Sequence, residues 1–176
     1  MSSVLFVIAP ERFRDEELFE TQSVLERAGH QSVIASTKLG LCPGSRGGYA
    51  EAIRTLDKES GFAYDAIIFV GGGGTTLLFS NADAWRIARE AMATGKVVGA
   101  ICLAPVILAN AGVLAGRQAT VAGTQAATLE AKGAYYTGPG VTVDGRLVTA
   151  NGPKSSRAFA IRIVELLAGA SPVDAS

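Results

Sequence analysis

The chain has 176 residues, 48% of them hydrophobic, which is enough to bury the core of one domain. Sixteen Lys and Arg balance sixteen Asp and Glu without any run of like charge, so nucleic-acid binding is not expected. There is no basic, signal-like N-terminus and no apolar run of eighteen residues, so we expect a cytoplasmic protein with no membrane association. Two cysteines and one histidine are too few for a disulfide framework or a four-ligand metal site, and no metal or other cofactor is expected.

The first part of the chain predicts a strand, a helix and a second strand. Val4–Ile8 is a continuous apolar run rich in β-branched and aromatic residues, typical of a strand buried on both faces. Residues 15–28 form an amphipathic pattern, with Asp15 as the expected N-cap and Gly29 directly after the helix. His30–Ser36 predicts the next strand, which completes a βαβ opening.

The middle of the chain continues the alternation. Glycines and a proline in residues 37–48 predict an irregular surface loop. Ala66–Val70 predicts a third buried strand, and Gly71–Gly74 follows it at once. A helix over Ala82–Ala93 then leads to a fourth strand, Lys96–Ile101.

The last part adds shorter elements. In order, we expect a small-residue helix that begins near Cys102 and ends before Gly112, a strand near Ala119–Val121, a helix over Thr124–Lys132, a hairpin pairing 141–143 with 147–149, and a helix over Ser155–Leu167. Strands that alternate with helices of this length predict a doubly wound α/β sandwich with a mostly parallel sheet. We assign residues 1–170 to one domain and 171–176 to a short polar tail.

Cys102 is the main candidate for chemistry. Ligands of open α/β sheets bind at the carboxyl ends of the strands, and Cys102 directly follows the fourth strand. A nucleophile elbow needs small residues two positions before and after the nucleophile, and Ala100 and Ala104 meet that need. A helix starting here would favour the thiolate and lower the pKa of the thiol. The competing interpretation is that a small cysteine at the end of a buried strand only fills the core.

Backbone groups beside Cys102 could serve the same chemistry. The N–H of Leu103 and that of a glycine in Gly71–Gly74 could converge on a developing oxyanion. The glycine run can also be read as a tight turn or as a phosphate cradle, although it lacks the Lys and Ser or Thr of a P-loop. Glu17 by itself would be an ordinary acidic residue in a first helical turn. His30 opens the second strand, at the amino end of the sheet, and is not expected to act as a catalytic base.

These residues occur in motifs that together resemble the ThiJ/PfpI superfamily. The motifs span nearly the whole chain: Asp15-Glu16-Glu17-Leu18, Arg27-Ala28-Gly29-His30, Phe69-Val70-Gly71-Gly72-Gly73, Ala100-Ile101-Cys102-Leu103-Ala104-Pro105, Ala111-Gly112-Val113-Leu114 with Gly116, and Asn151-Gly152-Pro153. The resemblance implies a flavodoxin-like fold in which Cys102 is the elbow cysteine and Glu17 the glutamate that hydrogen-bonds its sulfur. It also implies that the N–H groups of Gly73 and Leu103 form the oxyanion site.

The chain departs from the superfamily pattern in its histidines. The protease-like branch has a histidine directly after the cysteine, where this chain has Leu103, and the deglycase-like branch has one near the position of Ala122. With His30 at the other end of the sheet, a Cys-His-acid triad cannot be built within one chain.

Three functions remain open from the sequence. The first is a glyoxalase III or deglycase-like enzyme in which Cys102 attacks a small reactive carbonyl compound and Glu17 moves protons. The second is a redox-responsive stress protein in which an oxidant converts Cys102 to a sulfinate without turnover. The third is an intracellular cysteine peptidase, which the missing triad disfavours. The resemblance further implies a homodimer or a larger homo-oligomer.

Overall fold

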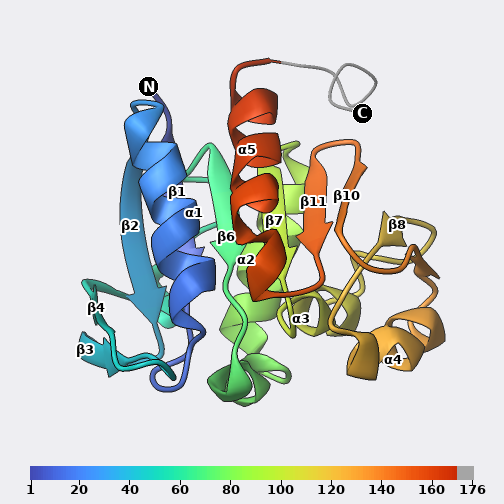
Figure 1. Cartoon of the computed structure of the whole chain (residues 1–176), viewed down its shortest axis with the longest axis horizontal. Helices are drawn as coiled ribbons and strands as arrows, with labels where there is room; N and C mark the ends of the chain where they lie inside the picture. The colour runs from blue at the N-terminus through green and yellow to red at the C-terminus, as the bar shows by residue number, and fades with distance from the viewer. Residues whose placement is uncertain (170–176) are drawn as a thin grey trace.

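The computed structural model describes residues 1–169 and shows a central sheet covered by helices on both faces (Figure 1). The seven strands of this sheet lie in the order β10 (Val141–Asp144), β11 (Leu147–Ala150), β7 (Val97–Ile101), β6 (Ala66–Phe69), β1 (Ser3–Val7), β2 (Gln31–Ser36) and β5 (Arg54–Thr55). Neighbouring strands are parallel except for β10 with β11. The predicted doubly wound, flavodoxin-like class is confirmed, while the predicted tail at 171–176 lies outside the described residues.

The helices form two layers, one on each face of the sheet. Their bounds are α1 (Asp15–Arg27), α2 (Ala82–Ala93), α3 (Pro105–Asn110), α4 (Ala126–Ala131) and α5 (Ser156–Leu167). In Figure 1, α1 and α5 lie side by side in front of the sheet, and α2 and α3 lie behind it. No helix within residues 1–169 has both the length and the apolar character needed to cross a membrane.

Strand β1 shows why the sheet is buried on both faces. Leu5 and Val7 belong to the apolar cluster under α2 and α3, while Val4 and Phe6 belong to the cluster under α1 and α5. All four side chains are fully buried. Because successive side chains of a strand point to opposite faces, only an unbroken apolar run can fill both cores, as the sequence predicted.

The segment 37–48 contains regular structure that the sequence did not predict. Strand β3 (Gly40–Pro43) pairs antiparallel with β4 (Tyr49–Ala52), so the expected irregular loop is wrong for residues 40–43. One face of this hairpin packs on the core, since Cys42 is fully buried. Neither strand is long enough, nor alternates clearly enough, to stand out from its glycine-rich surroundings.

Other short elements were not predicted from the sequence, namely strands β5 and β9 (Tyr135–Tyr136) and the 3₁₀ helices Leu56–Lys58, Gly73–Leu78 and Pro153–Ser155. The strand predicted near Ala119–Val121 is observed as β8 (Gln118–Ala119), which pairs parallel with β9, and a 3₁₀ helix covers Gly123–Gln125. The predicted helix at 124–132 is therefore a 3₁₀ turn followed by α4. Elements as short as these depend on tertiary contacts rather than on a local pattern, so the sequence carries little signal for them.

Asp15 does not cap helix α1, contrary to the sequence prediction. Arg14 is the N-cap residue, and Asp15 is the first residue of the helix. The Asp15 carboxylate instead accepts hydrogen bonds from the backbone N–H groups of Arg46 (2.9 Å) and Gly48 (2.8 Å), in the turn of the β3–β4 hairpin. This long-range role has no local sequence signature.

Replacing Asp15 with alanine is expected to destabilise the protein by about 2 kcal/mol, because two charge-assisted hydrogen bonds to the hairpin are lost. Urea unfolding of the variant would measure this change. Glu20→Ala, an exposed position on the same helix, is the control and should shift the free energy of unfolding by less than about 0.5 kcal/mol. Equal stability of the two variants would contradict the role of Asp15.

Candidate active site

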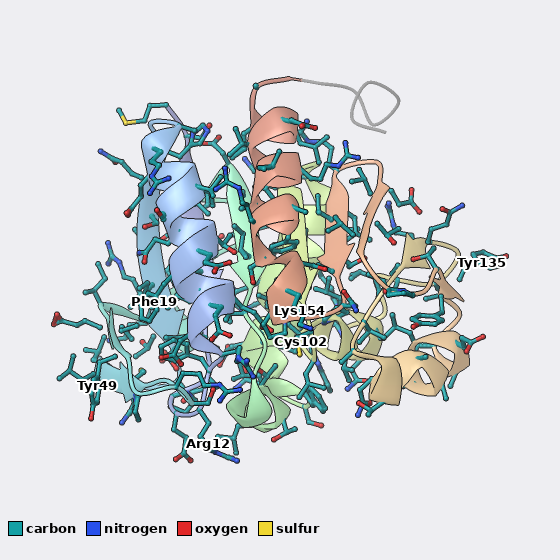
Figure 2. The ribbon with its side chains drawn as sticks, in the orientation of Figure 1. Arg12, Phe19, Tyr49, Cys102, Tyr135 and Lys154 are labelled. Atoms are coloured by element: carbon teal, nitrogen blue, oxygen red, sulfur yellow. The ribbon has the colours of Figure 1, made fainter. Side chains whose placement is uncertain are left out.

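The carboxyl ends of β1, β6 and β7 bring the candidate residues together. These three strands are adjacent, with β6 in the middle. The loop after β1 leads into α1 with Glu17 in its first turn, the loop after β6 begins with the glycine run, and Cys102 directly follows β7. Figure 2 shows Cys102 at the end of the sheet that faces down in that view. The topology therefore assembles the residues that the sequence singled out.

Cys102 occupies a strained turn, as the elbow pattern predicts. Its φ is 63°, a left-handed conformation that costs about 1–3 kcal/mol for a residue with a Cβ. Two backbone hydrogen bonds hold it there: its N–H donates to the Ala150 carbonyl (2.9 Å), and its carbonyl accepts from the Ala122 N–H (2.8 Å). Ala100 and Ala104 are both fully buried, so larger side chains would not fit beside the turn.

Glu17 lies beneath this turn and is completely buried. Its Oε1 accepts a hydrogen bond from the N–H of Gly71 at 2.9 Å. Its Oε2 forms no hydrogen bond of ordinary geometry within residues 1–169, although it is buried. The Cys102 thiol lies close enough to the Glu17 carboxyl to lower its pKa by hydrogen bonding, so the two side chains form a unit.

Gly71 separates the two side chains and has no room for a Cβ. A methyl group at this position would lie 2.6 Å from Glu17 Oε1 and 2.7 Å from Cys102 Cβ. It would also lie 2.5 Å from the carbonyl oxygen of Ile101, which belongs to rigid backbone. Gly71 thus has a role of its own within the glycine run, which the sequence did not reveal: its N–H bonds Glu17, and its lack of a side chain lets Cys102 approach.

The variant Gly71→Ala should lose about 2–4 kcal/mol of stability, because backbone and the Glu17–Cys102 pair must both move. Thermal unfolding would detect the loss. Gly123→Ala is the matched control, since a Cβ there meets nothing within 4 Å. If both variants unfolded at the wild-type temperature, the close packing around Gly71 would not exist in solution.

Burial controls the protonation of the pair. Burial raises the pKa of the Glu17 carboxyl to about 7, against the lowering effects of the Cys102 thiol, the Gly71 N–H and the Arg14 charge. Burial also raises the pKa of the Cys102 thiol to about 12, and the Glu17 carboxylate adds to the rise, while the Leu103 N–H lowers it. Near neutral pH the pair holds a thiol beside a carboxyl group that can both take up and release a proton.

The predicted lowering of the Cys102 pKa is therefore wrong for the resting site. Helix α3 begins only at Pro105 and has six residues, so its dipole has little effect on a sulfur three positions earlier. Ionising a half-buried thiol next to a carboxylate is unfavourable, because the thiolate loses solvation and is repelled by the Glu17 charge. Thiolate formation requires the proton to move to Glu17.

A pocket of about 310 Å³ opens onto the sulfur. Gly73 and Leu103, the residues expected to supply oxyanion N–H groups, both line it together with Cys102 and Glu17. Neither N–H donates a backbone hydrogen bond within residues 1–169. The structure thus brings all four predicted site residues to one pocket.

Gly72 and Pro153, which belong to motifs recognised in the sequence, also line the pocket. Arg14, Ser45 and Arg46, which were not singled out from the sequence, complete its wall. Arg14 directly precedes the Asp15-Glu16-Glu17-Leu18 motif, and this position is the one feature of the sequence that could have marked Arg14 as a site residue. Ser45 and Arg46 come from the hairpin turn, which could not be placed without the fold. A larger groove of about 610 Å³, which contains Lys154, shares Arg14 and Pro153 with this pocket.

The single histidine of the chain lies away from the pocket, as expected. His30 Nδ1 accepts a hydrogen bond from the N–H of Ser2, next to the amino ends of β1 and β2. Leu103 and Ala122 are the two positions where related branches carry histidine; Leu103 lines the pocket, and the N–H of Ala122 donates to the Cys102 carbonyl. A Cys-His-acid triad is therefore not formed within the chain.

Comparison with known proteins agrees with the fold and the motifs. The chain is 35% identical to a deglycase of Pyrococcus horikoshii, covering 93% of this chain and 98% of the relative. It is 28% identical to a glutathione-independent glyoxalase of Caenorhabditis elegans, covering 95% and 89%. The crystal structure of a ThiJ/PfpI domain protein from Brachyspira murdochii superposes with a TM-score of 0.93 at 31% identity, covering 96% and 98%. The DJ-1/PfpI family model matches residues 2–166, and the chain belongs to that family.

Proposed function

We propose that the protein converts small 2-oxo aldehydes to 2-hydroxy acids, with Cys102 as the nucleophile and Glu17 as the proton carrier. The observation that carries the proposal is the buried Glu17 carboxyl beside Cys102, with a pKa raised by burial to about 7. A group with this pKa can act as both base and acid near neutral pH. The names of the deglycase and glyoxalase relatives support a reaction on reactive carbonyl compounds.

The first step is attack on the aldehyde carbon. Glu17 takes the thiol proton as the sulfur forms its bond to carbon, so no free thiolate accumulates. The carbonyl oxygen becomes an oxyanion next to the N–H groups of Gly73 and Leu103, which are free to stabilise it. Glu17 then returns the proton to that oxygen, which gives a hemithioacetal and restores the carboxylate.

The second step moves hydrogen between neighbouring carbons. The Glu17 carboxylate removes the proton from the former aldehyde carbon, which gives an enediolate, and returns it to the former ketone carbon, while the hydroxyl proton on the former aldehyde oxygen passes to the former ketone oxygen. The product is a thioester of a 2-hydroxy acid on Cys102, and water hydrolyses it to release the acid and the thiol. The aldehyde carbon is oxidised and the ketone carbon reduced, so no external redox partner is required.

Conversion of methylglyoxal to lactate, followed by proton NMR, tests this proposal. In D₂O, solvent exchange of the proton on Glu17 should place deuterium at C2 of the lactate. Lactate without deuterium would contradict proton transfer by an exchangeable carboxyl group. A complete lack of lactate would contradict the proposed reaction.

A second candidate function is oxidation sensing by Cys102, favoured by the buried Oε2 of Glu17, which has no hydrogen-bond partner among residues 1–169. Two equivalents of hydrogen peroxide would convert the thiol to a sulfinic acid with release of two waters, and protonated Glu17 would donate a hydrogen bond to the sulfinate. Peptide mass spectrometry after mild peroxide treatment tests it. Oxidation of the buried Cys42 before Cys102 would rule this function out.

We further propose that the protein acts in the cytoplasm as a homodimer or a larger homo-oligomer. Membership of the family supports the assembly as an expectation. Sedimentation of the purified chain would measure its mass in solution, and a monomer at micromolar concentration would contradict the proposal.

A further inference from the structure

Arginines from different parts of the chain gather at the mouth of the Cys102 pocket. Arg14 comes from the start of α1 and Arg46 from the hairpin turn, and both line the pocket. Arg12, in the loop after β1, has its Nη1 atom 3.6 Å from the point where a Cβ of Gly73 would lie. The chain as a whole carries no net charge, so this positive region is local.

The acidic groups beside these arginines are Glu16, whose pKa both Arg14 and Arg46 lower, and Asp15, which accepts a hydrogen bond from the Arg46 N–H. Arg14 pairs with Glu16, at 2.9 Å between Nη2 and Oε2. Arg46 forms no ion pair within residues 1–169. The one acidic residue in the pocket wall is Glu17, which is buried beneath the sulfur. A ligand that reaches Cys102 therefore passes Arg46, whose side chain forms no ion pair within residues 1–169, and the Arg14–Glu16 pair.

The backbones that carry two of these arginines are held in place. The N–H of Arg46 donates to Asp15 Oδ1 at 2.9 Å. The N–H of Arg12 donates to the Pro43 carbonyl at 2.8 Å, and Arg12 has a left-handed φ of 53° although it is not glycine. Strained residues that their surroundings hold firmly are typical of functional sites. The conformational entropy of these backbones is already lost when the protein folds, so ligand binding does not have to order them.

We propose that the Cys102 pocket selects 2-oxo aldehydes that carry a carboxylate at their other end, with Arg46 and Arg14 binding that carboxylate. The inference rests on the proposed function and names its substrate class. A guanidinium fork matches a carboxylate, and the pair with Glu16 occupies Nε and Nη2 of Arg14 but leaves its Nη1 without a hydrogen bond within residues 1–169. Methylglyoxal has no carboxylate for these arginines to bind, so it should be a poorer substrate than a 2-oxo aldehyde that carries one.

A suitable substrate is 4,5-dioxopentanoate, with its methyl ester as the neutral counterpart. Its aldehyde carbon would become a carboxylate and the adjacent ketone an alcohol, so that addition of one water gives 2-hydroxyglutarate. We expect kcat/KM for the acid to exceed that for the ester by about ten-fold, and Arg46→Met to reduce this preference to about two-fold. Arg157→Met, an exposed arginine of α5 outside the pocket, should keep the wild-type preference.

Alkylation of Cys102 tests the charge selection without any need for turnover. The rate with anionic iodoacetate is divided by the rate with neutral iodoacetamide, so a change in thiol pKa cancels. We expect Arg46→Met to lower this ratio about five-fold and the Arg14→Met/Arg46→Met double variant to lower it further, while Arg157→Met leaves it unchanged.

The two experiments separate failure of the inference from failure of the proposed function. If the alkylation ratio depends on Arg46 but neither dioxopentanoate substrate is consumed, anion selection stands and the proposed reaction is wrong. If the alkylation ratio is the same in wild type and both arginine variants, the inference is overturned, whatever the enzyme turns over.

Discussion

Replacing Cys102 with serine is expected to lower kcat/KM for methylglyoxal by at least roughly 10³-fold, because the hydroxyl is a much weaker nucleophile than the sulfur. Serine retains the size of the side chain and accepts the same left-handed turn, so the elbow and its backbone hydrogen bonds should persist. The loss would therefore report chemistry rather than unfolding. Lactate formation measured under initial-rate conditions gives the comparison.

Cys42→Ala is the matched control for this experiment. Cys42 is fully buried in the β3–β4 hairpin and lies outside the Cys102 pocket. Its truncation should cost about 1–2 kcal/mol of stability through lost packing, with kcat/KM retained. Residual turnover by Cys102→Ser close to the wild-type rate would exclude covalent catalysis by this cysteine, even if lactate is formed.

Replacing Glu17 with glutamine is expected to stabilise the protein at pH 8 by about 3 kcal/mol and to leave its stability at pH 4 nearly unchanged. The reason is burial, which raises the Glu17 pKa from the ordinary 4.5 to about 7 in the folded state. The protonated form therefore contributes stability that is fully present below pH 4.5 and is lost as the pH rises through 7. Glutamine resembles the protonated form at every pH and can still accept the Gly71 N–H.

The same variant should lose catalysis, since an amide cannot carry a proton between carbons. We expect kcat/KM to fall at least about 100-fold. In the wild type kcat/KM should rise with pH as Glu17 ionises near pH 7, and in the variant this rise should be absent. A gain in stability together with a loss of activity would identify Glu17 as a residue kept for function at the expense of stability.

Unfolding by urea between pH 4 and pH 9 measures the stability difference. Glu20→Gln, at an exposed position of α1, is the control and should stay within about 0.5 kcal/mol of wild type at both pH values. If the curves for wild type and Glu17→Gln ran parallel across this range, Glu17 would be ionising at its ordinary pKa, and its role as a proton carrier near neutral pH would be lost.

The amino-acid sequence predicts the architecture well because that architecture depends on patterns that local segments carry. A strand such as β1 needs an uninterrupted apolar run to fill two cores, and α2 was placed with its observed bounds from its periodicity. Cys102 was identifiable because an elbow tolerates only small neighbours such as Ala100 and Ala104. Family motifs then connected Glu17 to Cys102 across 85 positions of sequence.

Tertiary structure decided the properties that depend on what lies near each group in space. The direction of the Cys102 pKa follows from burial and from the Glu17 charge, and both exceed the lowering effects of the Leu103 N–H and the Arg14 charge. The position of Arg46 follows from a hairpin held by Asp15 from another part of the chain. Local sequence specifies which groups are available, but desolvation and charge proximity act through space, and only the folded chain sets those distances.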